Sequence, residues 1–280
     1  MIRYAGGEWA ALFEASVGKF GIFGTKIYSQ YQTYGLSDGV LDLWLLLDGD
    51  RAVGAVSRLD GTVTLAADAA ADADELAAFL AAVGCRSYEG ERALCERVNA
   101  VIRGGLRSSR ILRWGGRSAP ADARPAAAAP CADGVPPGTA APAEDLGAVY
   151  ALLCAADPAF AARTDYAAWL TEVSHKRRHG LADIYILKVD ERIVSTIGIY
   201  FKDASRAILA GLATDPACRG RGYARRMMAH ATNAALAQGL EPWLLTAEDG
   251  IAAFHRACGF ADAGFWSQGG FESPPGPRNV

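Results

Sequence analysis

The sequence lacks the features that would place the chain in several large classes of protein. No uninterrupted apolar run approaches the ~20 residues that span a bilayer. The first twenty residues contain Glu8, Glu14 and Lys19, which interrupt any apolar core of a secretory signal. Basic residues are not in excess, because 28 Lys and Arg stand against 31 Asp and Glu for a net charge of −3. We therefore expect a soluble, cytoplasmic protein with no membrane or nucleic-acid partner.

The chain also lacks the cysteine and glycine patterns of metal and nucleotide sites. Its six cysteines form no C-x-x-C or zinc-like pair with histidines, so we expect reduced thiols and no metal; they are residues 85, 95, 131, 154, 218 and 258. No G-K-[ST] tripeptide is present, which excludes a Walker loop. A dinucleotide-binding fingerprint would need a third glycine where Arg225 stands.

A segment rich in alanine and proline divides the sequence. From Gly115 to Pro142 large apolar residues almost vanish, so the segment cannot bury enough surface to order itself. This pattern predicts a first domain over residues 1–115, a linker over 116–134 and a second domain over 135–280. Because half of all residues are apolar (51%), both domains can form a core.

The two halves contain similar strand patterns. Leu45–Leu65 and Ile186–Leu209 each read as three strands joined by tight turns, with Arg51-Ala52-Val53 in step with Arg192-Ile193-Val194. Either a duplication or two unrelated hairpins of similar chemistry explains the similarity of the two segments. After the third strand the halves differ, since a helix opens at Asp74-Glu75 in the first half with no preceding glycine turn.

In the second half the third strand leads into an arginine-glycine turn and then a helix. A turn of this kind at a helix start leaves several backbone N–H groups unpaired and pointing the same way, which makes a pocket for a phosphate. Gly220 and Gly222 allow close approach, and Arg219 or Arg221 can add a charge-assisted bond. A plain glycine-containing loop with solvated arginines is the alternative.

This turn resembles the acetyl-CoA loop of the GNAT acetyltransferase superfamily, whose pattern is [RQ]-x-x-G-x-[GA]. Arg219, Gly222 and Ala224 match it. A second motif of that family, A-x-x-[LF]-Y-x-x-x-G-F, is similar to "AAFHRACGF", in which Phe254, Gly259 and Phe260 match. The resemblance covers about residues 140–270, and the first half looks like a degenerate copy.

The resemblance implies an α/β (α+β) fold: a mixed, mainly antiparallel sheet flanked by helices, in tandem with a degenerate GNAT-like first domain. That domain would have a structural or substrate-cleft role. The implied activity is transfer of an acyl group from acetyl-CoA, as cosubstrate, to a primary amine on a small molecule or peptide. A non-catalytic acetyl-CoA-binding regulatory or sensing protein is the alternative. The sequence carries no signal for the acceptor's identity or the oligomeric state.

The resemblance also implies the site residues. The acetyl-CoA would contact one set of loop and strand residues: Leu212, Ala213, Thr214, Arg219, Gly220, Arg221, Gly222, Tyr223 and Ala224. His255 stands where the family commonly has a tyrosine acid, and it is either the general acid or a packed helix residue. Glu248 is either the base, directly or through water, or a cap or solvated loop charge.

Overall fold

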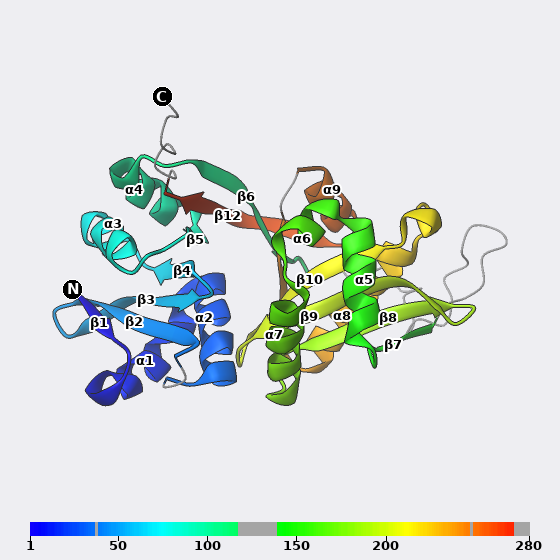
Figure 1. Cartoon of the computed structure of the whole chain (residues 1–280), viewed down its shortest axis with the longest axis horizontal. Helices are drawn as coiled ribbons and strands as arrows, with labels where there is room; N and C mark the ends of the chain where they lie inside the picture. Colours follow the sequence, from blue (N-terminus) through cyan, green and yellow to red (C-terminus); the bar gives the residue numbers. More distant parts are fainter. Residues whose placement is uncertain (37–38, 117–138, 247–248, 272–280) are drawn as a thin grey trace, which may run out of the picture. The chain divides into compact units, whose positions relative to one another are not determined.

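The computed structural model describes residues 1–36, 39–116, 139–246 and 249–271 (Figure 1). The chain forms two compact units that are not contiguous in sequence. The first contains Met1–Ile111 and the last strand from Ala263 onward, and the second contains Leu112–Thr246 and Gly250–Asp262. The predicted linker, apart from Gly116, lies outside the described residues.

The first unit is a sheet with helices. Its elements are β1 (Ile2–Tyr4), α1 (Ala10–Ser16), α2 (Gly21–Tyr34), β2 (Leu41–Asp48), β3 (Arg51–Leu59), β4 (Thr62–Ala67), α3 (Ala73–Ala82), β5 (Ser87–Glu91), α4 (Arg92–Ile102) and β6 (Leu106–Trp114), which ends in the second unit. The strand order is β1-β2-β3-β4-β5-β12. The β4–β5 pair is parallel, whereas β1–β2, β2–β3, β3–β4 and β5–β12 are antiparallel.

The second unit repeats this order of elements, with one additional short helix. It comprises β7 (Thr139–Pro142), α5 (Leu146–Ala156), α6 (Pro158–Arg163), α7 (Tyr166–Arg178), β8 (Asp183–Val189), β9 (Arg192–Lys202), β10 (Arg206–Thr214), α8 (Tyr223–Ala237), β11 (Glu241–Leu245), α9 (Asp249–Ala257) and the start of β12 (Phe260–Gly270), which continues in the first unit. The strand order is β6-β11-β10-β9-β8-β7, and β10–β11 is parallel. The predicted mixed, mainly antiparallel sheet flanked by helices is confirmed.

The matching hairpins of the two units share a bulge as well as a turn. In β2–β3 the register passes from Leu46↔Gly54 to Leu47↔Ala52, which leaves Val53 as the extra residue. In β8–β9 it passes from Leu187↔Ser195 to Lys188↔Ile193, which leaves Val194. Val53 and Val194 are the residues that the sequence alignment places in step, and bulges are specific features of a sheet rather than a generic property of hairpins. The shared bulge therefore favours a duplication.

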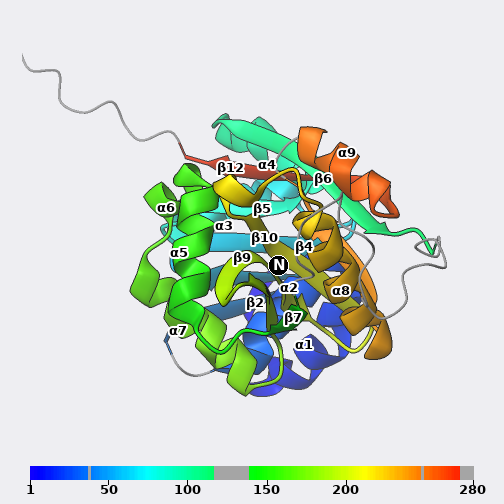
Figure 2. The ribbon, with the colours of Figure 1, turned by 90° about the vertical axis from the view of Figure 1, so that its right-hand side faces the viewer.

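In the second unit, helices cover both faces of the sheet. Helices α5, α6 and α7 lie on one side of β9 and β10, and α8 lies on the other (Figure 2). Helix α8 buries an apolar stripe of Met227, Met228, Ala231 and Ala235, each at most 1% exposed. Each buried methionine side chain contributes roughly 1.5–3 kcal/mol, and the small alanines contribute less, so burial of this stripe holds α8 on the sheet.

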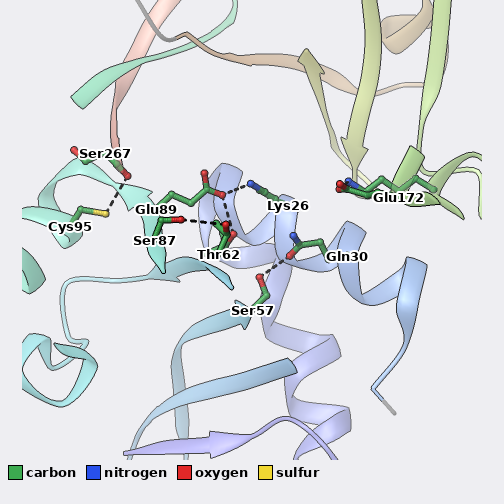
Figure 3. A network of polar contacts seen from close by, with 11 residues as sticks. Lys26, Gln30, Ser57, Thr62, Ser87, Glu89, Cys95, Glu172 and Ser267 are labelled. Atoms are coloured by element: carbon green, nitrogen blue, oxygen red, sulfur yellow. Dashed lines mark hydrogen bonds and ion pairs between the residues drawn. The ribbon is translucent and has the colours of Figure 1, made fainter. Parts of the chain in front are cut away.

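In the first unit, α2 packs on the sheet with polar as well as apolar side chains. The Lys26 ammonium pairs with the Glu89 carboxylate of β5, which also accepts a hydrogen bond from Thr64 at 3.0 Å (Figure 3). One turn further along α2, the Gln30 side-chain oxygen accepts a hydrogen bond from Ser57 at 2.7 Å. Each of these buried polar groups has a partner, as a low-dielectric interior requires.

Candidate active site

Strands β10 and β11 of the second unit separate part-way along their length. They pair in parallel from Arg206↔Glu241 to Leu209↔Leu244. Strand β10 continues to Thr214, whereas β11 ends at Leu245. The last five residues of β10 therefore extend beyond the part of the strand that is in register with β11.

A bulge fixes which backbone groups of β10 face this opening. The register with β9 passes from Ala210↔Gly198 to Ala213↔Thr196, so one of Gly211 and Leu212 is extra. The N–H of Asp215 donates to the Val194 carbonyl of β9 at 2.9 Å. Because backbone groups alternate between the two edges of a regular strand, Ala213 also faces β9 and Thr214 faces the opening, whereas Leu212 lies in the bulge itself. An N–H in the position of Leu212 can stabilise negative charge on a carbonyl oxygen.

The loop that follows β10 leads to an uncapped helix. A short 3₁₀ turn, Pro216–Cys218, is capped by the Asp215 carboxylate. Gly220 and Gly222 have φ of +78° and +80°, and a Cβ at either position would meet no heavy atom within 4 Å. Gly222 is the N-cap of α8 and supplies no side-chain hydrogen bond to the first turn. The N–H groups of that turn, at the positive end of the helix dipole, are thus open to an anion.

The two loop arginines are placed differently. Arg219 donates hydrogen bonds to the carbonyl of Ala156, at the end of α5, at 2.9 Å and to the carbonyl of Thr214 at 3.5 Å. Arg221 is exposed and forms no ion pair with any described residue. Arg219 therefore fixes the loop against α5, whereas the guanidinium of Arg221 is exposed to solvent.

Comparison with known proteins gives the family of the segment that contains this loop. The model of the acetyltransferase (GNAT) family matches residues 146–260. Residues 146–260 are a GNAT domain. No curated protein sequence matches the chain.

Solved structures with the same fold extend over nearly the whole chain. A tandem GNAT protein from the clavulanic acid biosynthesis pathway has a TM-score of 0.61 at 14% identity and covers 98% of this chain and 99% of its own. A GNAT-family acetyltransferase from Colwellia psychrerythraea has a TM-score of 0.57 at 14% identity, with 97% and 100% covered. A GCN5-related N-acetyltransferase from Kribbella flavida has a TM-score of 0.56 at 16% identity, with 91% and 97% covered. At these identities the likeness shows the fold.

His255 lies in the interior of the GNAT domain on α9. Its side chain is 5% exposed, and its ring contacts the rings of Phe254 and Phe260. Burial lowers the pKa of His255 to about 4, and its Nδ1 has no hydrogen-bond partner among the described residues. The imidazole is thus neutral near pH 7. Its role as general acid stays a prediction, and Glu248 lies outside the described residues.

The other predicted cofactor contacts of the GNAT domain fall into two groups. Leu212, Thr214, Gly220, Arg221 and Gly222 line the opening and its loop. Tyr223, the first residue of α8, is 1% exposed and packs in the core, and Ala213 is paired with Thr196. Contacts of acetyl-CoA with these residues remain predictions, and for the buried ones they would involve the backbone.

Sequence reasoning missed one contact of the GNAT domain, between Tyr200 of β9 and Gly211 of β10. A Cβ at Gly211 would lie 2.8 Å from the Tyr200 hydroxyl, so no larger residue fits there. Gly211 itself was a signal in the sequence, because a glycine inside a strand often marks a bulge or a close approach of another group. In the described part of the chain no cluster of His, Cys, Asp or Glu could hold a metal, and no helix is long and apolar enough to cross a membrane.

Proposed function

We propose that the second unit transfers an acetyl group from acetyl-CoA to a primary amine. One observation supports this most directly: the opening between β10 and β11 ends in a glycine loop whose helix N-terminus is uncapped. A diphosphate at that helix start would direct the pantetheine arm along the open edge of β10. The thioester carbonyl would then accept a hydrogen bond from the Leu212 N–H, which lowers the cost of negative charge on its oxygen.

A specific observation favours a second candidate, a protein that binds acetyl-CoA without transferring its acyl group. The residue in the position of the family's acid, His255, is a buried imidazole that is neutral at pH 7. The loss of a general acid would slow departure of the CoA thiolate by roughly 10²–10⁴-fold. Because a thiol has a pKa of about 8.5, its thiolate is a fair leaving group without an acid, and we therefore favour transfer.

One experiment separates the two candidates. Acetyl-CoA binding is measured by calorimetry, and thiol release is followed with a panel of primary amines. We expect binding and amine-dependent thiol release, with the acetylated amine detected by mass spectrometry. Tight binding with no acetylated amine from any member of the panel would favour the binding protein.

A further inference from the structure

Two bulges lie close together on the neighbouring strands β9 and β10 of the GNAT domain. In β9 the extra residue is Tyr200, and in β10 it is one of Gly211 and Leu212; only two register pairs separate the bulges. Gly211 has a φ of +65°, the left-handed conformation of the first residue in one common type of bulge, where glycine is favoured. The path of the backbone at Leu212 therefore depends on how Gly211 is held.

The side chain of Tyr200 covers two glycines, one on each strand. A Cβ at Gly211 would lie 2.8 Å from the Tyr200 hydroxyl oxygen and 2.9 Å from its Cε2. A Cβ at Gly198 of β9 would also lie 2.9 Å from this Cε2. Real Cβ atoms essentially never come so close to another heavy atom, so the ring has its place only because both residues lack a Cβ. The phenol ring thus rests directly on the backbone of the β10 bulge.

An apolar cluster holds the same ring in this place. The cluster combines buried residues of α5, α7 and β8, and Tyr200 packs against it. Its members Val149 of α5 and Val173 of α7 are 0% and 1% exposed. Because protein interiors are close-packed, a ring that contacts both this cluster and the two glycines has little room to move.

The bulge needs such support because its first residue is a glycine. A glycine populates many backbone conformations at similar energy, so Gly211 alone does not fix the direction of the next N–H. Any rotation at Gly211 turns the peptide group that carries the Leu212 N–H. A ring seated on Gly211 restricts this rotation.

On the basis of the proposed acetyl transfer, we propose that Tyr200 is a positioning residue, whose ring fixes the bulge on which the hydrogen bond from the Leu212 N–H to the thioester carbonyl depends. Tyr200 does not touch the reacting atoms in this role, and no proton passes through it. A donor stabilises developing negative charge best when it is held in place before the reaction. A misplacement of about 1 Å can cost about 100-fold in rate. The ring, and not the hydroxyl, therefore carries the effect.

The test varies the side chain at residue 200 and uses two measurements. The first is kcat with whichever of butylamine, spermidine or Nα-blocked lysine the wild type acetylates best. The second is the infrared band of the thioester carbonyl in bound acetyl-CoA that is labelled with ¹³C at this carbon. A hydrogen bond to the carbonyl lowers the frequency of the band, so the band reports on the Leu212 N–H whether or not an amine is present.

Tyr200→Ala should lose the effect, and Tyr200→Phe should keep it. In Tyr200→Ala we expect kcat to fall about 100-fold and the band to move towards that of acetyl-CoA in solution. The Kd for acetyl-CoA should stay within about threefold of wild type, since the lost stabilisation belongs mainly to the transition state. Tyr200→Phe leaves Cε2 and Cζ on the glycines, so its kcat should stay within about threefold of wild type, with an unchanged band.

Two further variants separate this inference from a loss of stability. Tyr185 of β8 is 9% exposed and lies edge-on to the ring of His230 of α8, away from the bulge. Tyr185→Ala removes a side chain of the same size and should cost stability, but it should keep the wild-type kcat and band. Gly211→Ala decides if Tyr200→Ala does not fold, because the added Cβ displaces the ring from the other strand and should lower kcat and move the band in the same direction.

Several results would overturn the inference. One is a wild-type kcat and band in Tyr200→Ala, and another is an equal loss in Tyr200→Phe, which would give the role to the hydroxyl. An equal loss in Tyr185→Ala would make the effect one of stability. A wild-type band at the frequency of acetyl-CoA in solution would leave no hydrogen bond to position. A wild type that acetylates no amine would instead overturn the proposed function, and the carbonyl band alone would then decide the inference.

Discussion

The two units build the connection from sheet to helix in opposite ways. In each unit one pair of strands is parallel and stays in register over only four positions. The β4–β5 register ends at Leu65↔Gly90, and the β10–β11 register ends at Leu209↔Leu244. In the second unit the next helix begins at an uncapped glycine. In the first unit the Asp72 carboxylate caps α3 and accepts from the N–H groups of Asp74 and Glu75 at 2.9 and 3.1 Å.

The charges around the two helix starts differ as well. The first turn of α3 carries two carboxylates, Asp74 and Glu75, which would repel a phosphate. Arg97 of α4, which could have offered a positive charge, donates instead to the carbonyls of Ala69 and Ala71 in this loop. A common arrangement of strands thus leads to the proposed anion site in one unit and, in the other, to a helix start that its own side chain caps. A few residues at the helix start decide between them.

The difference between the two helix starts depends most on Gly222, and Gly222→Val should abolish it by blocking the helix start of α8. A β-branched residue at φ +80° is strained by about 1–2 kcal/mol, and its side chain would occupy the space in front of the helix start. We expect the Kd for acetyl-CoA, measured by calorimetry, to rise at least about 100-fold. Gly239→Val is the matched control, because Gly239 has φ +75° just past the other end of α8 and should cost stability but not binding. Equal losses of binding in both variants would contradict the anion site.

A second difference is that α9 buries His255, whereas α4 buries Leu94, Cys95 and Val98. Because the folded pKa of about 4 is below the ordinary 6.5, the unfolded chain binds the extra proton between these values. The contribution of His255 to the free energy of unfolding is therefore fully present above pH 6.5. It is lost as the pH falls towards 4, which lowers the free energy of unfolding by at most about 3 kcal/mol. Urea unfolding at pH 7 and 4.5 should show this loss reduced in His255→Phe. His179→Phe, at an exposed position, should keep the wild-type dependence.

The polar contacts of α2 give a third way to sharpen the comparison. Lys26→Met leaves the Glu89 carboxylate, 9% exposed, without its ammonium partner. We expect a loss of about 2 kcal/mol in the unfolding free energy, below the 3–5 kcal/mol of a fully buried pair. Arg51→Met breaks an exposed pair with Asp48 and should change it by less than about 1 kcal/mol. Equal effects would mean that the Lys26–Glu89 pair adds nothing specific to the first unit.

The smallest expected effect belongs to the cap of α3. Asp72→Ala removes two hydrogen bonds to the helix start and should cost about 1 kcal/mol, as should Asp145→Ala, which removes the cap of α5. Uncapping α3 should not create a second acetyl-CoA site, because Asp74 and Glu75 remain. Calorimetry should therefore give one site per chain in both variants. Two sites in Asp72→Ala would show that the cap alone closes the first unit.

Local patterns predicted most of this architecture. The hairpins follow from turn residues between apolar runs. The two bulges were not predicted, although the alignment of Val53 with Val194 pairs the two extra residues. The anion loop follows from glycines between a strand and an amphipathic helix. Gly211 marked a close approach inside a strand, but its partner Tyr200 could not be identified in this way, because the contact depends on the bulge in β9. The burial of His255 could not be predicted either. The sequence gives the residue type, but the burial and the lowered pKa both depend on packing in the folded chain.

The path of β12 has a consequence for how the protein is made. Strand β5 has two neighbours, β4 and β12, and it pairs with Trp266–Gly270 of β12. A ribosome that has just finished Ile111 must add about 150 more residues before that partner exists, which takes roughly 8–30 s at 5–20 residues per second. During this interval the edge of β5 is an unpaired template for other strands. The first unit is thus translated early but completed late, so a nascent chain that stalls before Trp266 leaves this edge open to aggregation.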